Sequence, residues 1–129
     1  MFEQALQARP DTVADARKSV RDRLGGLLSP RRLAEAELLT SELVTNAVRH
    51  ARLKEGERIG LDIDVDTDTV HVAVVDGGKG FDFRKLFEES RDPRGGWGLF
   101  LVDKVSDRWG IDASPPHSVW FEIDRWHAK

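Results

Sequence analysis

Residues 30–51, PRRLAEAELLTSELVTNAVRHA, form the stretch that decides the fold of this chain. Apolar side chains recur in it every three to four positions, the spacing that places them on one face of an α-helix. Ser29 followed by Pro30 is typical of a helix start. We therefore predict one long helix over residues 30–51. Its buried face comprises Leu33, Ala36, Leu39, Leu43, Val44 and Ala47.

Three polar residues lie along one flank of this predicted helix. Glu42, Asn46 and His50 are spaced by four positions, so a helix stacks a carboxylate, an amide and an imidazole in one stripe. Leu43 and Ala47 lie beside the stripe, so the polar groups can point into a cavity instead of bulk water. Polar residues also border the buried face of ordinary helices, and for this stretch alone the two interpretations carry equal weight.

The remaining pattern is one of short elements separated by Gly, Pro and polar turns. Period-two alternation predicts strands, and three-to-four spacing predicts helices. In chain order we expect a short strand at 2–8, helices at 12–24 and 30–51, strands at 59–65 and 70–76, a short helix at 99–105, and strands at 109–113 and 118–124. This order does not alternate as parallel crossovers require, so we predict an α+β fold. It is a two-layer sandwich with helices on one face of a mixed, mostly antiparallel sheet.

Length and composition restrict the class of protein. The 129 residues are expected to form a single domain, residues 1–129, and the absence of cysteine excludes disulfides and thiol chemistry. No apolar run reaches the roughly 18 residues of a membrane span, and no signal peptide is apparent, so we expect a cytoplasmic protein with no membrane partner. A formal net charge of -3 lacks the basic footprint of a direct nucleic-acid binder.

A glycine-rich segment follows the predicted strand at residues 70–76. In VVDGGKGF, residues 74–81, Asp76 ends an apolar strand and glycines at 77, 78 and 80 allow the backbone to approach a ligand closely. A carboxylate at the edge of a pocket can accept a hydrogen bond from an exocyclic amine, as adenine would offer. The alternative is the glycine-rich end of a hairpin, in which Asp76 is a turn residue and binds no ligand.

A second glycine cluster precedes the short predicted helix. In RGGWGLFLVD, residues 94–103, Gly96 and Gly98 stand directly before Leu99 and the apolar pattern that follows. The unpaired backbone N–H groups of a helix start can bind a phosphate. Taken alone, such a cluster also marks loops without a ligand.

The order of these three motifs resembles that of the GHKL ATPases, a superfamily with the Bergerat ATP-binding fold that includes histidine kinases and gyrase. Residues 42–46 match the N box, Asp76-x-Gly78-x-Gly80 the G1 box, and Gly96-x-Gly98-Leu99 the G2 box, with the resemblance covering about residues 11–124. The stretch SELVTNAVRHA is most similar to the stand-alone domains of the anti-sigma factor serine/threonine-protein kinase branch.

This resemblance implies roles for individual residues. Asn46 would bind the Mg²⁺ of Mg-ATP, and Glu42 would be the catalytic general base. Asp76 would bind the adenine amine with help from Ser118. His50 would line the nucleotide pocket, although a histidine near a helix C-terminus is also favoured by the helix dipole. The remaining nucleotide-binding positions are Gly78, Gly80, Gly96, Gly98 and Leu99.

The function implied is that of a cytoplasmic regulatory kinase with ATP and Mg²⁺ as cofactors. It would transfer the γ-phosphate to a serine or threonine of an anti-sigma factor antagonist, with a sigma factor as a second partner in transcription regulation. The alternative is a non-catalytic or degenerate ATP-binding module that sequesters a partner protein. Glu42 distinguishes the two, since only phosphotransfer needs its carboxylate. The sequence leaves open whether the chain forms a homodimer.

Overall fold

The structure, a computed structural model, describes residues 2–7, 9, 11–50, 58–76, 98–112 and 117–126. Eight elements lie in these ranges. They are β1 (Phe2–Gln7), α1 (Thr12–Leu24), α2 (Pro30–His50), β2 (Arg58–Val65), β3 (Thr69–Asp76), α4 (Gly98–Val105), β4 (Arg108–Asp112) and β5 (Ser118–Asp124). Each predicted element is present within two residues of its expected bounds. The predicted end positions 8, 51 and 113 lie outside the described residues.

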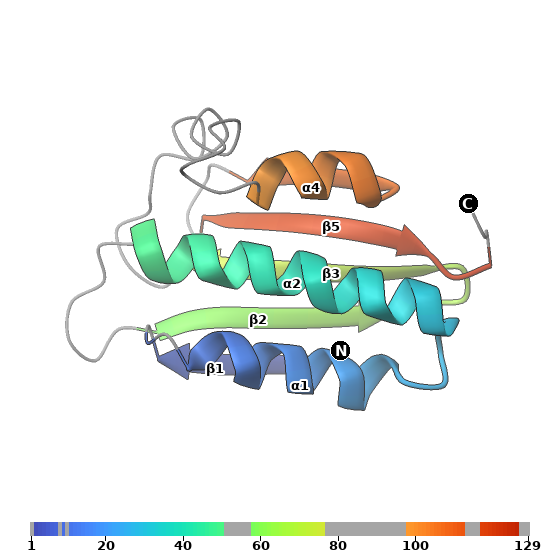
Figure 1. Ribbon diagram of the computed structural model, residues 1–129, viewed down its shortest axis with the longest axis horizontal. Helices are drawn as coiled ribbons and strands as arrows, with labels where there is room; N and C mark the ends of the chain where they lie inside the picture. Colours follow the sequence, from blue (N-terminus) through green and yellow to red (C-terminus); the bar gives the residue numbers. More distant parts are fainter. Residues whose placement is uncertain are drawn as a thin grey trace.

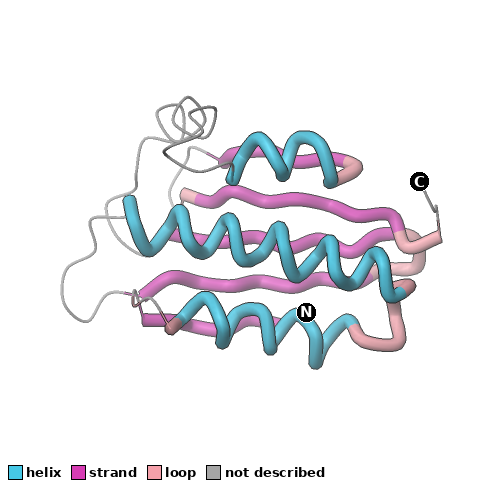
Figure 2. Tube along the Cα trace, viewed as in Figure 1, coloured by secondary structure: helices cyan, strands magenta, loops and turns pink. Residues whose placement is uncertain are grey.

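The strands form one sheet of order β1-β2-β3-β5-β4, in which every described pairing is antiparallel. The three helices cover one face of this sheet, and α2 lies between α1 and α4 (Figures 1 and 2). The predicted α+β class and two-layer arrangement are therefore confirmed. No helix among the described residues is long and apolar enough to cross a membrane.

The core lies between the two layers, where the helical stripes meet one face of the sheet. On α2, five of the six predicted positions are at most 1% exposed, and Leu33 is partly buried. On β5, Val119, Phe121 and Ile123 alternate inward, and Phe121 is fully buried. The apolar faces that the strand and helix patterns predict thus pack against each other in one core.

Capping groups mark the bounds of both long helices. The Ser29 hydroxyl accepts a hydrogen bond from the Arg32 backbone N–H at 3.2 Å, the N-cap expected before Pro30. Gly25 ends α1 and donates its N–H to the Arg21 carbonyl. A Cβ at Gly25 would lie 2.8 Å from that carbonyl oxygen, and Gly26 has a φ of 85°, so both positions favour glycine.

The other face of the sheet carries the alternating aspartates of β2. Asp62 and Asp64 alternate with buried Leu61 and Ile63, so they lie on the face that no described helix covers. Asp66 accepts hydrogen bonds from two backbone N–H groups in the β2–β3 turn. Among the described residues, no group of three or more His, Asp or Glu side chains is arranged to hold a metal ion.

Candidate functional site

The elements that carry the three motifs meet at one end of the molecule, which we call the convergent end. Helix α2 runs toward the end at which β3 stops, and both α4 and β5 begin there (Figure 1). Segments separated by dozens of residues are therefore brought to a common edge of the helix layer and the sheet. Because β5 is antiparallel to β3, its first residues pair with the last residues of β3 at this end.

One flank of α2 faces α4, and Glu42 and Asn46 share it. The orientation is set near the start of α2, where Arg32 forms an ion pair with Asp107, just after the end of α4. Helical spacing from Arg32 through Glu35 carries this flank to Glu42 and Asn46. Both functional candidates therefore lie on the α4 side of α2.

The opposite flank of α2 is identified by an independent contact. Glu37 accepts a hydrogen bond from Arg21 of α1 at 2.9 Å. The flank toward α1 is thus occupied by a structural ion pair. Glu42 and Asn46 lie on the other flank, which is the one toward α4.

Glu42 has a perturbed carboxyl group. Its side chain is half-buried, and this burial raises the pKa of Glu42 above its ordinary value because desolvation disfavours the charged form. A carboxylate with a raised pKa is a stronger proton acceptor once ionised. This is the electrostatic setting that a general base requires, one helical turn from Asn46.

Asn46 carries a buried polar atom without a partner. Its Nδ2 is inaccessible and makes no hydrogen bond within the described part of the chain. The same is true of Thr40 Oγ1, but Thr40 is fully buried on the core face of α2. An unpaired buried donor is costly, so the Asn46 amide has an unmet bonding capacity that a ligand can fill.

Asp76 is the last residue of β3, where it pairs in register with Ile59 of β2. Strand alternation puts position 76 on the same sheet face as Val72 and Val74, the face that the helices cover. The Asp76 side chain is outside what the structure describes, as are the side chain of His50 and residues 78, 80 and 96.

The start of α4 contributes backbone groups instead of side chains. Gly98 is its first residue, and Leu99 is 1% exposed within the core. Leu99 therefore anchors the helix by packing, while the first-turn N–H groups, which have no intrahelical acceptor, are the groups able to meet a ligand.

Ser118 lies on the other face of the sheet. It pairs with Val75, and it alternates with Val119, which is buried under the helices. The antiparallel register, continued by one residue, sets His117 opposite position 76 and on its face of the sheet. His117 was not among the residues singled out from the sequence, although counting back by two from the buried positions of β5 reaches it.

The chain is similar to a known domain family and to proteins of known name. A family model described as the histidine kinase-like ATPase domain matches residues 6–119. The serine-protein kinase RsbW of Staphylococcus aureus is 29% identical over 96 residues, an alignment that covers 64% of this chain and 60% of that protein. RsbW of Staphylococcus epidermidis is 29% identical over 87 residues, which cover 58% of this chain and 55% of the relative. The chain thus spans little more than half the length of these curated relatives.

One solved structure is similar in fold. A crystal structure of the RsbU and RsbW domains of Rv1364c from Mycobacterium tuberculosis matches with a TM-score of 0.67 and 18% sequence identity. The match covers 95% of this chain and 31% of that chain. The arrangement of helices and sheet described above is therefore a known one.

Proposed function

The chain belongs to the histidine kinase-like ATPase domain family, and from that premise we propose that it transfers the γ-phosphate of ATP to a serine or threonine of a regulatory partner protein. The observation that carries the proposal is the flank of α2 at the convergent end, where a half-buried carboxylate lies one turn from a buried amide nitrogen that has no partner among the described residues. Relatives named serine-protein kinase support a hydroxyl as the acceptor.

Asn46 fits the Mg²⁺ that the family implies. Its Oδ1 is a neutral oxygen ligand of the kind Mg²⁺ accepts alongside phosphate oxygens and water. Its Nδ2, unpaired within the described residues, is then available to donate to a phosphate oxygen. Bound Mg²⁺ supplies charge neutralisation on the phosphates, and Asn46 orients it from the wall of the site.

Glu42 would act as the general base. It accepts the proton of the attacking hydroxyl while the new oxygen–phosphorus bond forms and the bond to the ADP oxygen breaks. Its half-buried position favours this role, because the same desolvation that raises its pKa also strengthens it as a proton acceptor.

The adenine would bind at the end of β3 and the start of β5. Asp76 accepts a hydrogen bond from the adenine amine, and the glycines at 78, 80, 96 and 98 let the backbone close on the nucleotide. His50, from the end of α2, completes this part of the proposed site. We assign the position opposite Asp76 to His117, on the basis of the strand register, in place of Ser118.

Alanine substitutions at these two neighbours separate the assignments. His117→Ala is expected to weaken ATP binding about 5- to 10-fold, the effect of one lost polar contact. Ser118→Ala is expected to leave affinity within about twofold, because Ser118 lies on the opposite sheet face. Calorimetric titration with Mg-ATP measures both. A larger loss for Ser118→Ala would restore Ser118 to the site.

The partner proteins follow from the relatives by analogy. We propose an anti-sigma factor antagonist as the phosphate acceptor and a sigma factor as a second partner. The competing function is a non-catalytic ATP-binding module that acts by sequestering its partner. Both functions need Asn46 and Asp76, and only the first needs Glu42.

Titration with ATP, with and without Mg²⁺, tests the proposal at its base. We expect the wild-type chain to bind Mg-ATP, and Asn46→Ala to weaken that binding about 100-fold because both a metal ligand and a phosphate donor are lost. Removing Mg²⁺ with a chelator should weaken the wild type strongly and the variant only slightly. Absence of ATP binding by the wild type, even with Mg²⁺, would contradict both functions.

A further inference from the structure

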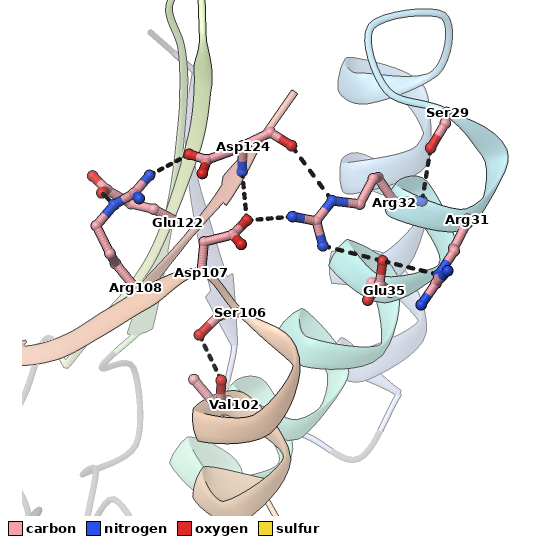
Figure 3. A network of polar contacts seen from close by, with 10 residues as sticks. All are labelled: Ser29, Arg31, Arg32, Glu35, Val102, Ser106, Asp107, Arg108, Glu122 and Asp124. Carbon is pink, nitrogen blue, oxygen red and sulfur yellow. Dashed lines mark hydrogen bonds and ion pairs between the residues drawn. The ribbon is translucent and has the colours of Figure 1, made fainter. Parts of the chain in front are cut away.

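A buried ionic cluster, drawn in Figure 3, joins the start of α2, the segment after α4 and the end of β5. These are the ends opposite to the proposed site (Figure 1). Arg32 is 3% exposed, and its guanidinium donates to the Asp107 carboxylate, to Glu35 Oε1 at 3.2 Å and to the Asp124 carbonyl at 3.4 Å. The Asp107 carboxylate also accepts the Asp124 backbone N–H at 2.8 Å. We call Arg32, Glu35, Asp107 and Asp124 the clamp.

The clamp joins three elements that each reach the proposed site at their other end. Arg32 lies in the first turns of α2, Asp107 lies two residues after the end of α4, and Asp124 ends β5. At the far ends of these elements lie Asn46, the start of α4, and the start of β5. The clamp therefore holds α2, α4 and β5 together about 20 Å from Asn46, at 1.5 Å per helical residue.

Hydrogen bonds at the clamp end hold the last turn of α4 and join it to β4. Ser106 donates its backbone N–H to the Val102 carbonyl at 3.0 Å and its hydroxyl to the same oxygen at 2.5 Å. Asp103 accepts a hydrogen bond from the Trp109 indole at 2.8 Å, which ties α4 to β4. Since α4 spans only eight residues, the position of this end sets the position of Gly98 at the other.

We propose that Arg32 and Asp107 are positioning residues for nucleotide binding, which set the placement of α4 relative to α2 and thereby the distance between the α4 start and Asn46. The inference rests on the proposed ATP-binding function. A guanidinium with three hydrogen-bonded directions fixes orientation more strictly than apolar packing, which allows neighbouring helices to slide. The clamp supplies that constraint on the α4 side of α2.

The α1 side of α2 offers a matched control. Arg21 and Glu37 also form an ion pair, at 2.9 Å, but it joins α1 to α2 and involves neither α4 nor β5. Glu37→Gln therefore removes one charge from an α2 ion pair, as Asp107→Asn does, without changing the α4 attachment.

The experiment compares Asp107→Asn and Glu37→Gln with the wild type, at a temperature where all three are folded by circular dichroism. We expect Asp107→Asn to weaken Mg-ATP binding about tenfold and Glu37→Gln to change it less than about twofold. Hydrogen exchange of the backbone amides at residues 102–105, measured without nucleotide, should quicken in Asp107→Asn and not in Glu37→Gln.

The outcomes separate the inference from the proposed function. Unchanged affinity and unchanged exchange in folded Asp107→Asn would overturn the positioning role, and equal losses in both variants would do the same. If the wild type fails to bind ATP, the proposed function falls, and the exchange rates alone decide whether the clamp positions α4. Should Asp107→Asn not fold, Arg32→Met/Asp107→Asn, which removes both charges together, takes its place with the same expected results.

Discussion

Replacing Glu42 with glutamine is expected to lower phosphotransfer by about 100-fold or more, while Mg-ATP affinity stays within about twofold. Glutamine keeps the size and half-buried position of the side chain but cannot accept the proton of the attacking hydroxyl. The measurement is the initial rate of label transfer from ATP to a candidate antagonist protein. Equal labelling by the two forms would remove Glu42 from catalysis.

The pH dependence of that rate gives a second readout of the same substitution. Burial raises the pKa of Glu42, so the folded protein holds the proton on this carboxyl to a higher pH than an ordinary glutamate does. Activity should therefore rise with pH through this raised pKa, and its loss on acidification should begin above the range where exposed glutamates protonate. Residual activity of Glu42→Gln should lack this acid limb. A limb that persists unchanged would assign it to another group.

Replacing Arg32 with methionine is expected to lower the free energy of unfolding by about 3 to 5 kcal/mol. The substitution leaves the Asp107 carboxylate, 4% exposed, without the guanidinium that neutralises it. Urea unfolding at neutral pH, followed by circular dichroism, measures the change. Arg32→Met/Asp107→Asn should recover at least half of the loss, because it removes the buried charge and keeps an acceptor for the Asp124 N–H.

Arg31→Met provides the control for this prediction. Arg31 is the neighbour of Arg32, but its side chain is 70% exposed and it approaches Glu35 only to 4.0 Å. Its replacement should change the free energy of unfolding by no more than about 0.5 kcal/mol. A loss of similar size at both positions would show that the effect belongs to the α2 start in general and not to the buried pair.

The two candidate functions differ in their need for a single side chain, that of Glu42. A sequestering module needs the nucleotide pocket as a structural switch, whereas a kinase also needs a base beside it. Glu42 is present, half-buried and on the flank of α2 that leads to the convergent end, which favours the kinase. The transfer assay with Glu42→Gln therefore tests the choice directly.

The periodic patterns predicted the elements well because they are local. The stripe of α2 and the alternation of β2 depend on residues two to four positions apart, and both are present in the structure. The sequence also predicted that Glu42 and Asn46 share one flank, since helical geometry alone requires it. The family resemblance, not periodicity, supplied their roles.

Strand faces near chain turns were harder to predict. Ser118 was chosen by resemblance, but the register of β5 with β3 puts it on the face away from the helices and sets His117 opposite position 76. A shift of one residue reverses every side chain of a strand, so an assignment by motif at a strand end depends on the register. The role of Ser118 stays a prediction.

By itself, the sequence determined the elements, their buried faces and the shared flank of Glu42 and Asn46, because these follow from spacing within single helices and strands. Only the tertiary structure decided that this flank faces α4, that β3, α4 and β5 meet it at one end, and that Arg32 is buried against Asp107. Arg32 and Asp107 stand 75 positions apart, and each reads in sequence as an ordinary surface charge. Their pairing depends on how the helix layer packs across the sheet, an order that no local pattern encodes.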